Sequence, residues 1–108
     1  MPRISGSIGA TKMKILAIIC HNANCGDTNY GYIIWKKLKE HFHIYLQDKD
    51  IGNVYHHLND LCYLGMLERG EFGIDNGRCP YKITDGGLAM KEKFEKFIEI
   101  IGEDNKHF

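Results

Sequence analysis

Residues 48–69 read DKDIGNVYHHLNDLCYLGMLER and combine the signals of a complete helix with the start of a strand. Four apolar residues recur at the spacing of one helical face: Ile51, Val54, Leu58 and Leu61. The acidic cluster at 48–50 supplies an N-cap and suits the positive end of the helix dipole, and Gly65 stands where a left-handed C-terminal cap belongs. The pattern predicts a helix that ends at about Leu64.

The opposite face of this predicted helix is polar. It carries four side chains that point the same way: Asn53, His56, His57 and Asp60. An asparagine can bond an adenine edge through two hydrogen bonds, and a histidine can donate to guanine or phosphate, so a base-reading helix would present such a row. A merely solvated face gives the same pattern, and the pattern alone does not separate the two interpretations.

Two helices are predicted before this segment. Thr11 can cap the first, which ends in the polar stretch 21–27, and Asp27 or Thr28 can cap the second, which runs to about His43. Their apolar stripes have helical spacing: Ile15, Leu16, Ile18 and Ile19 in the first helix, and Tyr30, Ile33, Ile34 and Leu38 in the second.

A hairpin and a last helix are predicted after the same segment. Two strand-like pieces, Met66–Arg69 and Tyr81–Thr84, flank the glycine-rich stretch Gly70–Pro80. Thr84 or Asp85 can cap the final helix. Its apolar residues lie on one face, and charged residues largely cover the rest: Met90, Phe94, Phe97, Ile98 and Ile101.

This order of elements predicts an α+β fold, mainly α, of the winged helix-turn-helix type, with a three-helix core and a two-stranded wing. Residues 1–10 are glycine- and serine-rich without periodicity, which predicts a flexible N-terminal arm. Residues 11–84 form the predicted winged-helix DNA-binding domain, and residues 85–108 form a C-terminal helix and tail.

Length, composition and net charge limit the classes of protein to which this chain can belong. The 108 residues have room for one domain, and their 44% apolar and 26% charged residues are near the averages of globular proteins. The apolar run from Ile15 to Cys20 is too short to span a bilayer, and no secretory signal is recognisable, so we expect a cytoplasmic protein without a membrane segment. The net charge of zero leaves room for a basic face but predicts weak nonspecific attraction to DNA.

Metal-binding and catalytic patterns are missing from the sequence. A reducing cytosol favours free thiols for the four cysteines: Cys20, Cys25, Cys62 and Cys79. No CxxC or HxxxH pair occurs, so no metal or other cofactor is predicted. The sequence also lacks a glycine-rich phosphate loop, a GxSxG turn and an HExxH helix, and therefore nothing points to an enzyme.

Three segments together resemble the PadR-like family of winged-helix regulators. Residues 15–18 (ILAI) and 30–38 (YGYIIWKKL) are similar to the family's "ILALL … HGYEI … L". Residues 51–68 (IGNVYHHLNDLCYLGMLE) resemble "GTLYRxLxRLExxGLV", and residues 77–87 (GRCPYKITDGG) resemble "GRxRKYYxLTExG". The three segments occur in the right order and cover roughly residues 15 to 90.

The resemblance implies a homodimer that binds double-stranded DNA and senses a small-molecule effector at its dimer interface. Pairing would use a C-terminal dimerisation helix, whose apolar stripe is too large to be left in water: Met90, Phe94, Phe97, Ile98 and Ile101. A place in the core of the same chain is the other explanation for that stripe. Gly31 is expected to allow close helix packing.

The leading hypothesis is a dimeric transcriptional repressor whose third helices enter successive major grooves. The expected DNA contacts are bases for Asn53 and His56, phosphate or the core for Tyr55, and phosphate for Lys49, His57, Arg78 and Lys82. Because imidazole titrates near neutrality, the histidines predict tighter binding at mildly acidic pH. Two alternatives stay open, namely a winged-helix protein-interaction module and a thiol- or metal-responsive sensor.

Overall fold

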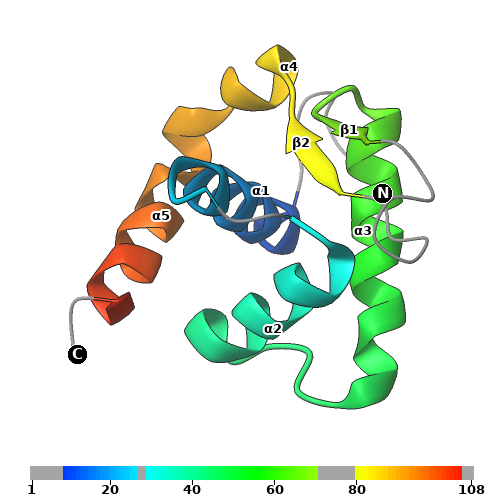
Figure 1. The fold of residues 1–108 in the computed structure, drawn as a ribbon, viewed down its shortest axis with the longest axis vertical. Coiled ribbons are helices and arrows are strands. Elements are labelled where there is room, and N and C mark those ends of the chain that lie inside the picture. Colours follow the sequence, from blue (N-terminus) through cyan, green and yellow to red (C-terminus); the bar gives the residue numbers. More distant parts are fainter. Residues whose placement is uncertain (1–8, 27–28, 71–79, 106–108) are drawn as a thin grey trace.

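The computed structural model describes residues 9–26, 29–70 and 80–105, and its elements follow the predicted order (Figure 1). Three helices come first: α1 (Ala10–Asn24), α2 (Gly31–Phe42) and α3 (Ile51–Tyr63), the last preceded by the 3-10 turn η1 (Asp48–Asp50). Two strands and two helices follow: β1 (Leu67–Arg69), β2 (Tyr81–Ile83), α4 (Asp85–Leu88) and α5 (Lys91–Asn105). This is the mainly helical α+β architecture that the sequence predicts.

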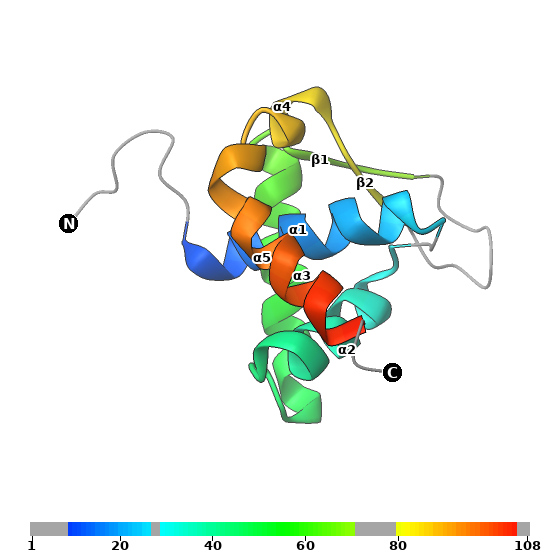
Figure 2. The same ribbon diagram turned by 90° about the vertical axis from the view of Figure 1, so that its left-hand side faces the viewer.

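Helix α1 lies at the centre of the fold and is buried on all sides. Residues Ile15 to Ile19 are consecutive, and each is at most 1% exposed. Helices α2 and α3 and the wing pack on one side of α1, and α5 packs on the other (Figures 1 and 2). Because a helix without a polar face has to be covered around its whole circumference, α1 needs α5 as well as the other helices.

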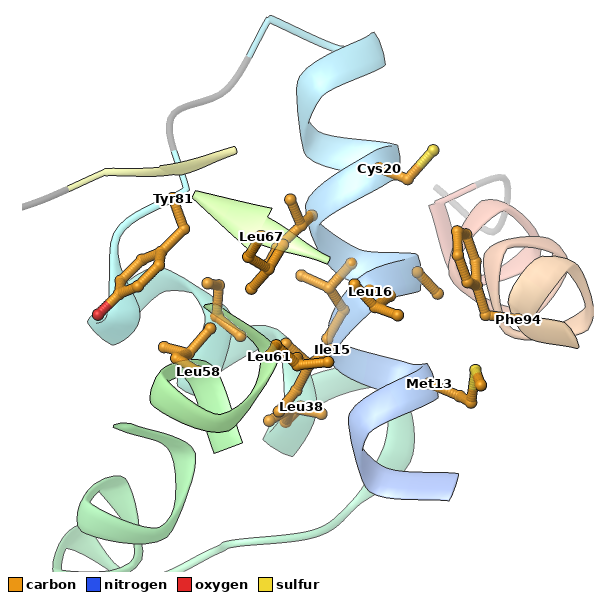
Figure 3. Close-up of a cluster of buried hydrophobic side chains, with 14 of the residues drawn as sticks. Met13, Ile15, Leu16, Cys20, Leu38, Leu58, Leu61, Leu67, Tyr81 and Phe94 are labelled. Atoms are coloured by element: carbon orange, nitrogen blue, oxygen red, sulfur yellow. The ribbon is translucent and has the colours of Figure 1, made fainter. Parts of the chain in front are cut away.

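Helix α5 therefore belongs to the core of its own chain. Phe94 is 0% exposed and Ile101 1%, and the Phe94 ring lies on the side of α1 that carries Met13 (Figure 3). Phe97 packs edge-on against Phe42 of α2, with 5.6 Å between the ring centroids. The sequence analysis expects the apolar stripe of the C-terminal helix at a dimer interface. For Phe94 and Ile101 this expectation is wrong, because both side chains are buried in the core of their own chain.

The predicted last helix is in fact two helices, separated by a turn at residues 89–90. Thr84 caps α4 as predicted, because its Oγ1 accepts a hydrogen bond from the backbone N–H of Gly87 at 3.1 Å. The same hydroxyl donates to the carbonyl of Gly65. A Cβ at Gly87 would collide with the carbonyl oxygen of Met66, so this glycine lets α4 pack directly on the segment that joins α3 to β1.

Helix α3 ends as predicted. Gly65 follows it with a φ of +80°, the left-handed conformation expected after a helix C-terminus. At the other end, the acidic cluster forms η1 instead of a simple cap, and Asp50 accepts a hydrogen bond from the backbone N–H of Gln47 at 3.1 Å. The two ends of the helix are thus fixed by local contacts.

The N-terminal caps of the first two helices differ from the prediction. Gly9 rather than Thr11 precedes α1, and Tyr30 precedes α2. Asp27 and Thr28, the caps expected for the second helix, lie outside the described residues, as do residues 1–8 of the predicted arm. Neither observed N-cap residue caps its helix through a side-chain hydrogen bond, so these helices begin where packing rather than capping allows.

A buried polar network joins α1 to the wing. Asn29 Nδ2 donates to the carbonyl of Ile19 at 3.1 Å, and Asn29 Oδ1 accepts from Asn22 Nδ2 at 2.9 Å. The backbone carbonyl of Asn29 accepts from the N–H of Tyr81 at 2.9 Å, at the start of β2. Strand β2 pairs antiparallel with β1, and Tyr81 lies opposite Arg69. Asn29 therefore fixes the connection after α1 and the root of the wing to each other.

None of the helices in the described ranges has the length and apolar character that crossing a bilayer requires.

The placement of α5 predicts how a core substitution in that helix behaves. Phe94→Ala should lower the free energy of unfolding by about 3–5 kcal/mol, because it removes a fully buried aromatic side chain and leaves a cavity. Ile100→Ala on the same helix is the control, since Ile100 is 39% exposed. Urea unfolding followed by circular dichroism measures both. A Phe94→Ala chain as stable as the control would place α5 outside the core.

Candidate nucleic-acid interface

Helix α3 presents one polar edge to solvent. Val54, Leu58 and Leu61 are fully buried and hold the helix against the core, whereas Asn53 and His56 are exposed. The helix runs along the edge of the molecule, on the far side of α1 from α5 (Figures 1 and 2). The two side chains expected to contact bases are therefore accessible on one helix edge.

His57 is placed differently from its neighbour His56. Its Nε2 shares a hydrogen bond of 3.0 Å with Tyr45 Oη, and its buried Nδ1 has no hydrogen-bond partner among the described residues. Burial, helped by the nearby charge of Lys12, lowers the pKa of His57 from its usual value, and the carboxylate of Asp60 opposes this shift. This geometry does not favour the phosphate contact expected of His57, because the ring faces the connection before α3 and resists a positive charge.

Tyr55 lies between α3 and the start of α2. A Cβ at Gly31 would overlap the Tyr55 ring, so the glycine permits close helix packing as expected, and the helix that approaches it is α3. The Tyr55 side chain is still 41% exposed. It thus combines a packing contact with access to a ligand at the surface.

The predicted phosphate-binding cations come from both ends of the site. Lys49 is exposed in η1, directly before α3, and Lys82 is exposed in β2 of the wing. Arg78, expected at the tip of the wing, lies outside the described residues. Asp48 is exposed next to Lys49, so the positive charge at this end of α3 is local rather than extended.

Two further cations reach the outer side of α3. Arg69 Nη2 donates to Asn59 Oδ1 at 2.6 Å, and Lys12 Nζ lies 3.5 Å from Asp60 Oδ2. The Arg69 guanidinium also lies 5.8 Å from the centroid of the Tyr81 ring across the wing. The sequence signal for Arg69 is its position shortly after the tight turn at Gly65, which returns β1 along α3.

The cysteines and histidines in the described residues do not assemble a metal site: no group of three or more His, Cys, Asp or Glu side chains comes together there. Cys20 is buried, and burial raises the pKa of the half-buried Cys62 thiol. Cys25 is exposed, and its Sγ lies 4.0 Å from Nδ1 of His21. Cys79 lies outside the described residues.

The residues expected at a dimer interface divide into two groups. Phe94 and Ile101 are buried against α1, as described above. Met90, Phe97 and Ile98 are partly buried against the same core and keep some exposed surface. Any contact that α5 makes with a second chain therefore has to use its outer side.

Comparison with known proteins bears on the fold. No protein-family model matches the chain, and no curated protein matches its sequence. Solved structures of RosR from H. salinarum match it over nearly its whole length. The RosR structure from crystals grown in NaBr is 21% identical, with a TM-score of 0.61, over 97% of this chain and 100% of that one.

Two structures of RosR complexes, designated RosR-S4 and RosR-S1, are each 20% identical to the chain. The first has a TM-score of 0.61 over 94% of this chain and 91% of that one, and the second has 0.60 over 92% of each. At these identities the likeness shows the fold: the chain has the α+β winged-helix fold of the RosR structures.

Proposed function

We propose that this chain is a sequence-specific, DNA-binding transcriptional regulator that inserts α3 into the major groove. The observation that carries the proposal is the exposed edge of α3, where Asn53 and His56 point outward while the opposite face is locked in the core. Such an edge can offer hydrogen bonds to bases, the main source of sequence discrimination in the major groove. The likeness in fold to RosR, a transcription regulator of the winged-helix type, supports the same function.

Phosphate contacts are assigned to the cations that flank this edge. Lys49 precedes α3, Lys82 belongs to the wing, and Arg69 is held beside α3 by Asn59. Arg78, which the sequence predicts at the wing tip and which lies outside the described residues, completes the proposed set. Contacts of this kind orient a protein on the duplex without reading its sequence. Since the chain has no net charge, its affinity for nonspecific DNA should be low.

We assign the regulator to the PadR-like group on the strength of the three similar segments, and propose a cytoplasmic, non-enzymatic homodimeric repressor that responds to a small-molecule effector. Within the dimer, the contact would involve the outer side of α5, where Phe97, Ile98 and Ile100 keep exposed surface, together with Met90 directly before the helix. Two copies of α3 related by a two-fold axis would then read a palindromic site.

One observation favours a second candidate function, a protein-interaction module. Tyr63, at the end of α3, is 91% exposed, and Leu64 and Leu88 are exposed as well. Exposed apolar side chains suit protein contacts better than phosphate contacts. A neutral chain fits such a partner without any electrostatic requirement.

Selection of bound sequences from a random duplex pool tests the proposed function. We expect enrichment of a palindrome with half-sites about one helical turn apart, since each protomer presents one α3. The affinity for the selected site should fall as salt rises, with a slope of about −0.9 in log K against log salt for each phosphate contacted. A selected pool in which no sequence is enriched would contradict sequence-specific DNA recognition. An affinity that does not depend on salt would favour the protein-interaction module.

Substitutions of Asn53 and of Lys82 should weaken DNA binding in different ways. Asn53→Ala should weaken binding to the selected site by about 1–3 kcal/mol and relax the preference at one base pair, because a base contact is lost. Lys82→Gln should weaken all sequences alike and reduce the salt slope by about 1. Asn24→Ala, at the exposed end of α1, is the matched control for the first change. Equal losses on specific and random DNA in Asn53→Ala would remove Asn53 from base reading.

His57 should contribute nothing to the dependence of DNA binding on pH. The lowered pKa of His57 means that this ring stays neutral at a pH where an ordinary histidine takes up a proton. Tighter binding between pH 8 and pH 6 should therefore survive in His57→Gln. Fluorescence anisotropy of a labelled duplex measures it, and loss of the pH dependence in this variant would contradict the assignment.

A further inference from the structure

The connection between α2 and α3 has an unusual backbone. Both His43 and Tyr45 are in the left-handed region, with φ of +56° and +55°. His43 directly follows α2, where such a residue is common, but a bulky aromatic residue rarely adopts this conformation within a connection. The conformation of Tyr45 persists only if the surrounding contacts stabilise it.

Two hydrogen bonds hold Tyr45 from opposite sides. Its backbone carbonyl accepts from Nε1 of the buried Trp35 on α2, at 2.8 Å. Its side-chain oxygen shares the bond of 3.0 Å with Nε2 of His57 on α3. Lys39 lies over the Trp35 ring, 3.5 Å from the centroid, and further fixes that ring. Tyr45 thus joins α2 through its main chain to α3 through its side chain.

Burial favours a neutral His57 ring, and its Nε2 shares the bond with Tyr45 while the ring faces the connection. A protonated imidazole would carry a second N–H at the buried Nδ1, where the described residues offer no acceptor. The charged and titratable groups around the ring are Lys12 of α1, Asp60 and His56 of α3, and Tyr45 itself. Of these, the positive charge of Lys12 opposes protonation, and only Asp60 favours it.

We propose that Tyr45 is a positioning residue for DNA binding, which acts through His57 to fix α3 relative to α2. The inference rests on the proposed function. His57 lies one turn after Asn53 and directly after His56, so a bond that holds His57 also holds the part of α3 that would read bases. In this arrangement Tyr45 and His57 contact no DNA themselves.

Tyr45→Phe tests the inference because it removes only the phenolic oxygen. Loss of one hydrogen bond should weaken binding to the selected duplex about two- to tenfold, while the salt slope stays the same because no phosphate contact is lost. Tyr63→Phe is the matched control, with the same chemical change on a side chain that is 91% exposed. Thermal unfolding confirms that both variants are folded at the temperature of the binding measurement.

The double variant shows whether Tyr45 acts through His57. Tyr45→Phe combined with His57→Phe should bind no more weakly than the weaker of the two single variants, since both changes break the same bond. Additive losses would overturn the coupling. A salt slope reduced by about 1 in His57→Phe would show a direct phosphate contact and would also overturn the inference.

Intrinsic fluorescence separates this inference from the proposed function. Trp35 is the only tryptophan, and its indole N–H is bonded to Tyr45, so its emission reports on the connection without DNA. We expect Tyr45→Phe and His57→Phe to shift the emission and Tyr63→Phe to leave it unchanged. Unchanged emission and DNA affinity in Tyr45→Phe would overturn the role of Tyr45 alone. A chain that binds no duplex would overturn the proposed function and, with it, any role of Tyr45 in DNA binding.

Discussion

Burial of α1 is the constraint on which the rest of the structure depends. Five consecutive residues, Ile15 to Ile19, leave this helix without a polar side, and each large aliphatic member stabilises the fold by about 1.5–3 kcal/mol when removed from water. No single layer of helices can cover such a surface. The fold therefore packs α2, α3 and the wing on one side of α1 and α5 on the other (Figure 1).

This constraint decides what each of the outer helices can do. Helix α3 gives three fully buried residues to the core and keeps its other edge free for a ligand. Helix α5 gives Phe94 and Ile101, so less of it is left for a partner. Association through α5 would thus rest on half-buried side chains such as Phe97, whose ring already packs on Phe42.

The sequence predicts the elements of the fold better than it predicts what covers them. The spacing of Val54, Leu58 and Leu61 defines the buried face of α3, and Gly65 defines its end, because both signals are local. The stripe of α5 is equally clear, but periodicity states only that a face is apolar. The sequence feature that indicates where α5 packs is the apolar run at 15–20, because this run has no polar face to turn toward water.

The residues of the candidate site show the same difference between local features, which the sequence predicts, and packing partners, which it does not. Helical spacing correctly puts Asn53 and His56 on an exposed edge, yet it puts His57 in the same row. The structure separates His57 from its neighbour through the left-handed backbone at Tyr45, a conformation that belongs to a connection without periodicity. No pattern along α3 could have revealed a partner that lies before its first turn.

The charge balance of the chain makes this placement matter for the proposed function. Lys12 pairs with Asp60 and Lys49 lies beside Asp48, so among the described residues part of the positive charge around α3 is offset by carboxylates, whereas Arg69 keeps its charge beside Asn59. A regulator with such a surface gains little from long-range attraction to phosphate. Its discrimination has to come from hydrogen bonds to bases, which depend on where Asn53 is held to within a few tenths of an ångström. Under the proposed function, the contacts that seat α3 on α2 are therefore part of recognition.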